Sequence, residues 1–503
     1  MSSTTMNLTT DAWIPALRAD GTRHLFSLQA LFAEAHQLRD LAVKPHERIA
    51  LMRLLLCITQ AALDGPADQE EWEECRDDIQ PKVRAYLNRW RASFELLGDG
   101  PRFLQLANLS AAKEDDEGTP ATKLDLSLAT GNTSTVFDNA ASETRSLQTA
   151  RAALNLLTFQ CFSPGGRIGV ACWDGRDTAG KGSSNHAPCT PSSMLHSYLL
   201  GATLLETIAR NLLSKQIVSD TIADGWGKPV WEVPVAKPSD TAAIRNATLS
   251  YLGRLLPLSR AIRLHENGSA IILGNGLEYP ILPAFRETTA TIVLRKDEPA
   301  PLPASTGRSI WRQLHSITVK RRAKSDVASG PLAFGLNPIT KAVSIWSGAF
   351  ITDKAKIEDV VEATYSVPPE LFDPFGQAAY EAAVAHAETA ATNLGKAIGS
   401  YSAALKIDSP AYDKGRQDFW TTVEQSLDAL FAAAREKTPP EAFTASPWGR
   451  AVRDAARAAY ERTCPRRTPR QLQAYATGLR LLHAAPAAKA ANSPTKKTRR
   501  KNS

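Results

Sequence analysis

The sequence SVPPELFDPFGQAAYEAAV, residues 366–384, marks a change in the character of the chain. Before it, short runs rich in β-branched residues alternate with prolines. After it, the chain loses these runs and becomes rich in alanine with a helical repeat. Because a proline pair interrupts regular structure, we place a domain boundary at Pro368–Pro369. The predicted domains are residues 1–367 and residues 368–484.

The second domain is predicted to be a helical bundle. Within residues 411–437, one apolar stripe repeats at spacings of four, four, three and four residues, formed by Phe419, Val423, Leu427, Leu430 and Ala434. Breaks divide the domain into four helices, and they fall at Asp408–Pro410, Pro439–Pro440 and Pro465–Pro469. Four helices with short connections favour an antiparallel four-helix bundle. The remaining residues, 485–503, have too little apolar surface to order themselves and are predicted to form a disordered basic tail.

The first domain mixes helices and strands. Apolar periodicity predicts helices over residues 45–63, 144–160 and 195–213. β-like runs predict strands over residues 269–274, 289–295 and 342–350. Prolines punctuate these strands, which favours an α+β domain over a regular barrel. The predicted fold class is therefore α+β, with a large mixed N-terminal domain followed by a C-terminal four-helix bundle.

Composition and charge narrow the functional classes. The 503 residues are 43% hydrophobic and 22% charged, as in ordinary globular proteins, and no apolar run approaches the length of a membrane span. Six scattered cysteines indicate reduced thiols, so we expect a cytoplasmic protein. The net charge is +7, and the basic residues cluster late in the chain, at Arg295–Lys296, Lys320–Lys324, Arg450–Arg470 and the tail. Such clusters favour a polyanionic partner, although any single cluster can be a solvated surface.

A glycine-rich basic stretch, SPGGRIGVACWDGRDTAGKGS at residues 163–183, raises two enzymatic alternatives. Gly175 and Gly180-Lys181 match the start of a P-loop, but Gly182 stands where Ser or Thr would bind magnesium, and the following residues resist helix formation. A zinc site is the second alternative, with candidate ligands Cys161, Cys172, His186 and Cys189, of which only His186 and Cys189 have local ligand spacing. A P-loop-like or zinc-dependent hydrolase built on residues 161–189 therefore stays open. No other catalytic motif is present, which favours a binding protein without cofactors over an enzyme.

Several segments together resemble a known family. They are MNLTTDAWIPAL (6–17), FSPGGRIGVACWDGRDTAGKGSSNHAPC (162–189), GNGLEYPILPAFRETTATIVLRK (274–296) and SIWRQLHSI (309–317), followed by the helical bundle. In this order they resemble the large subunit of the type I-E Cascade, a CRISPR RNA-guided surveillance complex, and the resemblance extends to about residue 484.

The resemblance implies a protein that is not an enzyme. It implies recognition of the protospacer-adjacent motif (PAM) in double-stranded DNA, the start of strand separation for R-loop formation, and recruitment of a helicase-nuclease. The implied partners are the guide RNA, the target DNA, and the backbone, small and 5′-end cap subunits of the complex. No membrane partner or metal is implied. A scaffold that never touches DNA is the remaining alternative.

The resemblance also assigns roles to residues. A glycine loop that enters the minor groove matches Gly165, Gly166, Arg167, Ile168 and Gly169, where bare backbone allows close approach to base edges. A strand-splitting wedge at the tip of a β-hairpin matches Thr340 and Lys341, where the family has glutamine. DNA-guiding cations match Arg295 and Lys296, and a loop that reaches the guide RNA matches Phe137, Asp138 and Asn139. Further phosphate contacts are expected from Lys320, Arg321, Arg322, Arg466 and Arg467.

One family feature is missing from the sequence. The lysine that would reach the motif is implied some residues before Asn275-Gly276-Leu277, and the matched position holds Ser269, with no lysine nearby in sequence. Another basic residue therefore has to supply this contact, or the preferred motif differs.

Overall fold

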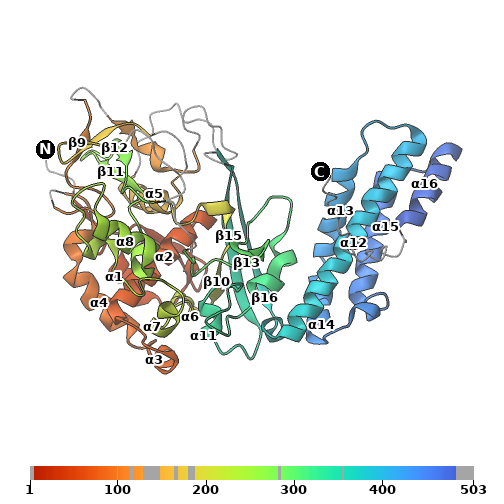
Figure 1. The fold of residues 1–503 in the computed structure, drawn as a ribbon, viewed down its shortest axis with the longest axis horizontal. Coiled ribbons are helices and arrows are strands. Elements are labelled where there is room, and N and C mark those ends of the chain that lie inside the picture. Colours follow the sequence, from red (N-terminus) through yellow and green to blue (C-terminus); the bar gives the residue numbers. More distant parts are fainter. Residues whose placement is uncertain are drawn as a thin grey trace, which may run out of the picture. The chain divides into compact units, whose positions relative to one another are not determined.

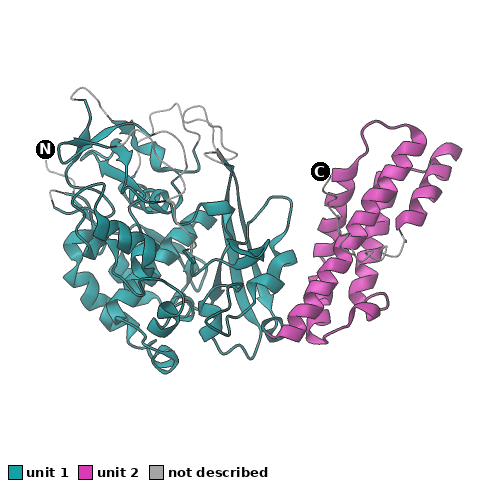
Figure 2. Cartoon of the chain, viewed as in Figure 1, with its two compact units in different colours: residues 1–372 teal, residues 373–503 magenta. Residues whose placement is uncertain are grey.

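The computed structural model describes residues 5–98, 100–113, 118–128, 148–163, 168–178, 187–280, 285–353 and 356–482. The chain divides into two compact units, Met1–Phe372 and Asp373–Ser503 (Figures 1 and 2). Unit 1 combines helices with several small sheets, and unit 2 is helical, so the predicted α+β class with a C-terminal bundle is confirmed. In the ranges given above, no helix is both long enough and apolar enough to cross a lipid bilayer.

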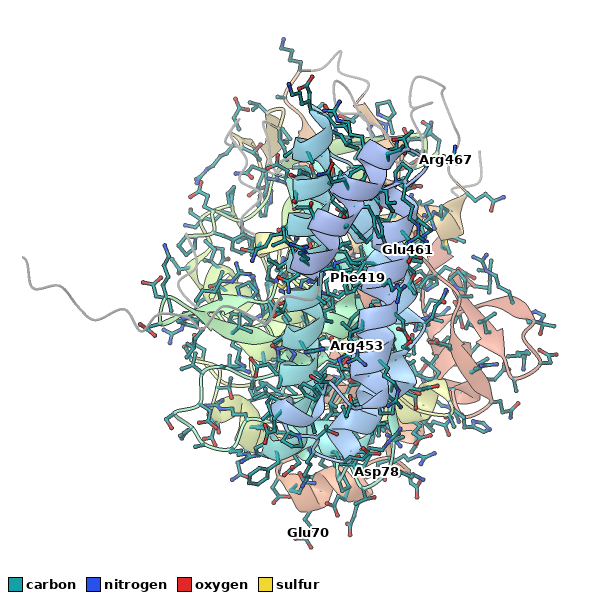
Figure 3. The ribbon with its side chains drawn as sticks, turned by 90° about the vertical axis from the view of Figure 1, so that its right-hand side faces the viewer. Glu70, Asp78, Phe419, Arg453, Glu461 and Arg467 are labelled. Carbon is teal, nitrogen blue, oxygen red and sulfur yellow. The ribbon has the colours of Figure 1, made fainter. Side chains whose placement is uncertain are left out.

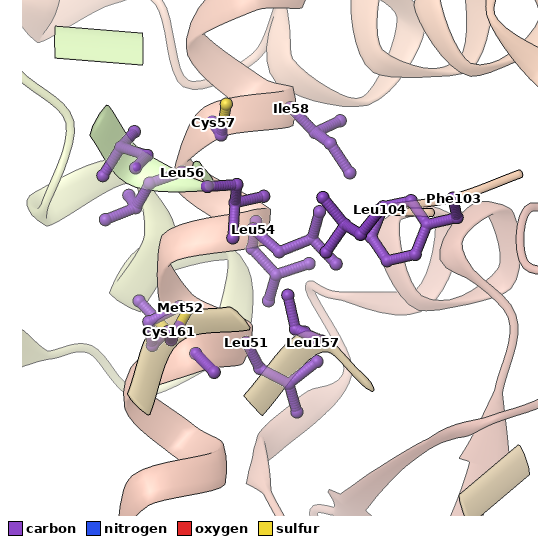
Figure 4. Close-up of a cluster of buried hydrophobic side chains, with 14 of the residues drawn as sticks. Leu51, Met52, Leu54, Leu56, Cys57, Ile58, Phe103, Leu104, Leu157 and Cys161 are labelled. Carbon is purple, nitrogen blue, oxygen red and sulfur yellow. The ribbon is translucent and has the colours of Figure 1, made fainter. Parts of the chain in front are cut away.

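Helix α2 (Pro45–Leu63) forms the centre of unit 1. Its apolar side chains cover most of its circumference, and a helix of that kind is stable only when it is surrounded. Figure 4 shows Leu51, Leu54 and Ile58 of this helix packed near Phe103, Leu104 and Leu157. The predicted helix over residues 45–63 is confirmed.

Unit 1 contains further helices. They are α1 (Leu28–Glu34), α3 (Gln69–Glu74), α4 (Ile79–Arg89), α5 (Thr149–Phe162), α6 (Leu204–Arg210), α7 (Lys215–Ser219), α8 (Thr241–Leu249), α9 (Tyr251–Leu255), α10 (Leu314–Ile317) and α11 (Ala333–Leu336). Of these helices, α4, α5, α6 and α9 pack against α2. Helix α5 confirms the helix predicted over residues 144–160 from Thr149 onwards. It is buried along almost its whole length.

The strands of unit 1 form separate small sheets. One has the order β3-β2-β4, built from β2 (Ile14–Arg18), β3 (Arg23–Phe26) and β4 (Leu38–Leu41). A second has the order β11-β12-β7, from β7 (Thr119–Pro120), β11 (Arg260–Leu264) and β12 (Ala270–Asn275). A third has the order β6-β8-β9, from β6 (Leu109–Ala111), β8 (Ala171–Trp173) and β9 (Arg176–Asp177). Two-stranded pairs are β1 (Met6–Asn7) with β5 (Glu95–Leu97), and β13 (Ile292–Arg295) with β14 (Glu298–Pro301).

The longest strands form an antiparallel hairpin, β15 (Val343–Asp353) and β16 (Lys356–Val367). Strand β10 (His196–Leu200) pairs with the first part of β15, from Ser344 to Gly348. Beyond Gly348 the two long strands pair with each other as far as Asp353 and Lys356, and β10 does not accompany them. The distal half of the hairpin is therefore two-stranded.

The helix predicted over residues 195–213 is wrong in its first part. Residues 196–200 form strand β10, and helix α6 begins only at Leu204 behind the N-cap Thr203, whose hydroxyl accepts from Glu206 N. Gly201 lies between the strand and the helix. A larger residue does not fit at this position, because a Cβ there would lie 2.4 Å from Glu206 Cβ. Backbone pairing with β15 overrides the helical pattern of the sequence.

A charged group lies inside unit 1. Arg53 of α2 is fully buried, and its guanidinium pairs with Glu287 at 2.7 Å. The same carboxylate accepts from Arg254 Nε at 2.9 Å. Burial acts to raise the pKa of Glu287, but the charges of the two arginines outweigh it and hold that pKa below its usual range.

Unit 2 is built around the long helix α12 (Pro374–Leu405), which packs against α13 (Tyr412–Glu424), α14 (Leu427–Arg435), α15 (Pro447–Thr463) and α16 (Pro469–Leu482). The second predicted helix is divided at Gln425–Ser426 into α13 and α14. Close approach of α16 depends on Gly478, since a Cβ there would lie 2.0 Å from the Tyr460 hydroxyl and 2.7 Å from Ala397 O. Trp448 is buried in the bundle and donates to Ala383 O at 2.8 Å.

Candidate nucleic-acid interface

The described parts of the glycine-rich stretch, residues 163–183, lie between a buried helix and a small sheet. Helix α5 ends at Phe162, and Arg260 Nε fixes the next residue by donating to Ser163 Oγ at 2.7 Å. Of the predicted loop residues, Gly165, Gly166 and Arg167 lie outside the described residues, whereas Ile168 and Gly169 lead into β8, the central strand of the β6-β8-β9 sheet. Ser163 and the start of β8 are thus both tied to the core of unit 1.

The described residues give Gly169 no packing reason to be glycine. A Cβ built on it meets none of their atoms within 4 Å, and Gly169 is not among the residues of positive φ. The next residue, Val170, is 42% exposed. The described part of the fold would therefore tolerate a side chain at Gly169, and bare backbone here is available to a partner.

Two sheets support this segment. Gly274 of β12 packs directly on β8, because a Cβ at Gly274 would lie 2.9 Å from Ala171 Cβ and 3.0 Å from Thr178 Oγ1. The backbone amide of Ala171 also donates to Thr178 Oγ1 at 3.1 Å. The strand that follows Gly169 is therefore held in place by β12.

The structure brings one lysine to the neighbourhood of Ser269. Ser269 is exposed in the turn before β12, where its hydroxyl donates to Asn267 Oδ1 at 2.8 Å. Ala121 N donates to Ser269 O at 3.0 Å, which places the 3-10 helix η2 (Ala121–Leu124) beside this turn. Lys123 lies in η2, and partial burial lowers its pKa from the usual range. Sequence reasoning missed Lys123 because 146 positions separate it from Ser269 in the chain.

The basic pair Arg295–Lys296 lies at the tip of the β13–β14 hairpin. Arg295 pairs in register with Glu298, and Lys296 and Asp297 form the turn, with φ of 51° and 64°. All four side chains are exposed. Two carboxylates therefore accompany the two cations that are predicted to guide DNA.

Thr340 and Lys341 do not lie at a hairpin tip, so this prediction of their position is wrong. Both residues are exposed in the connection between α11 and β15. The hairpin turn lies at the other end of β15, between Asp353 and Lys356. The reason is that β15 begins only at Val343, so the sequence matched to a tip precedes the first long strand.

The stretch Lys320–Arg322 is not a continuous exposed track. Lys320 Nζ donates to Asn337 O at 2.9 Å and lies 5.5 Å from the ring centroid of Phe372. Arg321 is half-buried and donates to Asp220 O at 3.2 Å and to Thr221 Oγ1. Only the side chain of Arg322 is exposed. The fold itself uses the first two cations.

The bundle does present cations on its surface. Figure 3 shows Arg453, Glu461 and Arg467 along the side of unit 2 that carries α15 and α16. Arg466 lies 3.7 Å from Glu461 and 5.1 Å from the ring centroid of Tyr475, and Arg467 is exposed. These residues can contact phosphates, but Glu461 offsets part of their charge.

The enzymatic alternatives gain no support from the described residues. Gly175 lies in the turn between β8 and β9 at a φ of 74°, and not in a loop that opens a helix. Cys161 and Cys189 are buried neighbours whose backbones are hydrogen-bonded at 3.1 Å, whereas Cys172 lies on β8. Among the residues with described positions, no group of three potential metal ligands occurs. His186 and the predicted RNA-contacting residues Phe137, Asp138 and Asn139 lie outside the described ranges.

Known proteins are similar to this chain in sequence and in fold. A CasA/Cse1 protein from Thermus thermophilus is 27% identical over 492 residues, which cover 91% of this chain and 92% of that protein. The crystal structure of Thermobifida fusca Cse1 matches with a TM-score of 0.75 at 22% identity, over 95% of this chain and 97% of the other. A chain of a solved CRISPR RNA-guided surveillance complex matches with a TM-score of 0.74 at 19% identity, over 95% and 100%.

The family itself is decided by a match that spans most of the sequence. The family model described as CRISPR-associated protein Cse1 matches residues 7–459. This confirms the resemblance to the large subunit of the type I-E Cascade. The chain belongs to the Cse1 family of CRISPR-associated proteins.

Proposed function

We propose that this protein is the non-catalytic large subunit of a CRISPR RNA-guided surveillance complex, that it recognises a PAM in double-stranded DNA, and that it starts strand separation. Its partners would be the guide RNA, the target DNA, the backbone, small and 5′-end cap subunits, and a helicase-nuclease recruited after target binding. The family match and the likeness to chains of solved surveillance complexes support this proposal. In such complexes the protein reads a short motif and base pairing reads the rest.

The observation that carries the proposal is the open surface at Gly169. Neither its backbone angles nor packing by the described residues requires this glycine, which follows Gly165, Gly166 and Arg167 closely in the sequence. Backbone without side chains can approach base edges in the minor groove, which is about 6 Å wide. Minor-groove reading is degenerate, so we expect tolerance of several related motifs.

Strand separation is assigned to the distal half of the β15–β16 hairpin. Its strands have eleven and twelve residues, and β10 supports only the proximal part. Its inner part packs on the core of unit 1, where Phe350 stacks on His46 of α2 with ring centroids 4.9 Å apart. The end of the hairpin around Thr352 and Asp353 is more open and can occupy the place of an opened base pair. Unstacking a step costs a few kcal/mol, which the contacts of the separated strands would offset.

The test of motif recognition uses two matched glycines. Gly169→Asp and Gly307→Asp each place a carboxylate where no atom lies within 4 Å of the new Cβ, so neither should disturb folding. In the reconstituted complex with guide RNA, we expect Gly169→Asp to weaken binding of motif-containing duplex by about tenfold or more, through repulsion and blocked approach. Gly307→Asp should bind as the unaltered protein does.

The measurement is equilibrium binding to a duplex library randomised beside the guide-matched site. Enrichment of a short motif by the unaltered complex, lost or altered with Gly169→Asp, is the expected result. Equal affinities and equal enrichment for both variants would contradict the proposed role of the glycine segment.

A further inference from the structure

Unit 1 contains a cavity of about 600 Å³ whose lining includes no residue of the glycine segment. Its walls come from the β13–β14 hairpin, the end of α7, the segment after residue 285 and the loop at residues 321–327. A volume of this size lies within the range of about 300–1,000 Å³ that is typical of small-ligand sites.

The carboxylates of this cavity already have partners. Asp220 pairs with Lys324 at 2.7 Å. Glu287 is shared by Arg53 and Arg254 at 2.7 and 2.9 Å. Asp326 Oδ2 accepts from the backbone amides of Arg322 and Ala323 at 2.8 and 2.9 Å.

Two arginines that line the cavity have no ion pair within the described structure. Arg286 donates to Val327 O at 2.8 Å, to Ser329 Oγ and to Gly330 O, and its Nε is buried without an acceptor in the described structure. Arg321 donates to Asp220 O and Thr221 Oγ1 and to the carbonyls of two residues in its own loop. All these acceptors are neutral.

The guanidinium groups of Arg286 and Arg321 also repel each other. Burial, followed by the charge of Arg321, lowers the pKa of Arg286 to about 10. Like charges held together away from water are unfavourable unless an anion compensates them. A ligand with a negative group would relieve this repulsion, and a guanidinium fork suits the oxygens of a phosphate.

Apolar side chains form a further part of the cavity lining. Phe285 forms part of the wall, with the Arg254 guanidinium 5.2 Å from its ring centroid. The other apolar lining residues are Pro191, Met194, Ile292, Pro299, Ala300, Pro301 and Val327. Such a wall accepts a flat ring or another apolar body next to the charged floor.

We propose that this cavity binds a single nucleotide, with its phosphate at Arg286 and Arg321 and its base against the apolar wall. The nucleotide can come from a free nucleoside monophosphate or from a nucleic-acid strand on this subunit. Only the second source rests on the proposed function. The exposed tip of the same β13–β14 hairpin carries Arg295 and Lys296, which would hold a neighbouring phosphate of such a strand.

The first experiment measures calorimetric binding to the full chain alone. The probes are deoxyadenosine monophosphate, inorganic phosphate, deoxyadenosine and glutarate. We expect the monophosphate to bind most tightly, phosphate more weakly, and the nucleoside and the dicarboxylate not at all. Failure of the monophosphate to bind, or equally tight binding of glutarate, overturns the proposal.

Variants locate the binding site. Arg321→Gln should weaken binding of the monophosphate by about tenfold. Arg84→Gln is the matched control, because its exposed side chain does not line the cavity. Ala300→Trp fills the cavity and leaves both arginines in place, so it should abolish binding even if Arg321→Gln destabilises its loop. Unchanged binding in Arg321→Gln and Ala300→Trp overturns the proposal.

The second experiment identifies the source of the nucleotide in the reconstituted complex. Weaker binding of target DNA with Arg321→Gln, but not with Arg84→Gln, supports a nucleotide of a bound strand. Unchanged DNA binding together with binding of the monophosphate supports a free nucleotide. Loss of motif selection with Gly169→Asp is measured separately, so the proposed function can fail while the cavity still binds nucleotide.

Discussion

At the scale of single residues, His46 shows how burial controls charge. It lies near the start of α2, is 2% exposed, and stacks on Phe350 with ring centroids 4.9 Å apart. Its Nδ1 has no hydrogen-bond partner within the described structure. Burial lowers the pKa of His46 to about 4, while the nearby charges of Glu47 and Asp125 oppose those of Lys44 and Arg151.

This burial predicts a loss of stability in weak acid. The folded protein holds His46 neutral, so its contribution is complete above the unfolded pKa of about 6.5 and is lost as the pH falls towards 4. Between pH 7 and pH 5 we expect the free energy of unfolding to fall by about 2 kcal/mol. Urea unfolding of the full chain at the two pH values measures it.

The variants for this test are His46→Phe and His24→Gln. The first should remove the loss between pH 7 and pH 5, because no group at that position then takes up a proton. The second alters an exposed histidine and should keep the loss. The same fall in both variants would show that another group is responsible.

Single residues also define how far the sequence could predict the candidate site. The glycine-rich stretch that contains Gly169 could be singled out from the sequence, whereas the strand β8 that follows it was not predicted. Lys123 and Arg286 could not be recognised, since each is brought to its site by contacts between segments far apart in the chain. Charge patterning alone also placed Lys320 and Arg321 on the surface, whereas hydrogen bonds draw them inwards.

At the scale of elements, sequence periodicity predicted best where a helix depends on its own pattern. In unit 2, Phe419, Val423, Leu430 and Ala434 of the predicted stripe are buried. In unit 1, α2 has its predicted bounds. Pro45 begins the helix, and its apolar side chains cover so much of its surface that it is stable only when buried. Prediction failed at β10, where a helical pattern is overridden by pairing with β15, a partner more than a hundred residues away.

The β13–β14 hairpin supports a prediction about DNA affinity. If Arg295 and Lys296 hold two phosphates, Arg295→Gln with Lys296→Gln should reduce the slope of log affinity against log salt by about 2. The double variant Asp297→Asn with Glu298→Gln should strengthen DNA binding, because it removes two carboxylates that repel phosphates from the same exposed tip. Binding of target duplex by the complex across a salt series provides the measurement.

Lys237→Gln serves as the control for the hairpin, since it removes an exposed cation elsewhere in unit 1. It should leave the salt dependence unchanged. If Arg295→Gln with Lys296→Gln leaves the salt slope unchanged, Arg295 and Lys296 do not belong to the proposed interface.

At the scale of the whole molecule, the chain has two separate cores. The core of unit 1 surrounds α2, and that of unit 2 surrounds α12. Trp311 is fully buried in the first unit and Trp448 is 1% exposed in the second. Units with their own cores can unfold independently.

Calorimetry of the full chain should therefore show two unfolding transitions. Truncation of a large buried aromatic residue costs about 3–5 kcal/mol, so Trp448→Ala should lower the midpoint of one transition and Trp311→Ala that of the other. A single transition that both variants shift equally would indicate that the units unfold as one.

The distribution of thiols has a practical consequence. All six cysteines are free, five of them are buried, and Cys172 on β8 is only half-buried. Cys172 follows Gly169 by three positions, on the central strand β8, against which Gly274 packs. The alkylation rate of the native protein is therefore governed by this one sulfur, and it provides a built-in reporter of access to the strand that follows Gly169, without an engineered label.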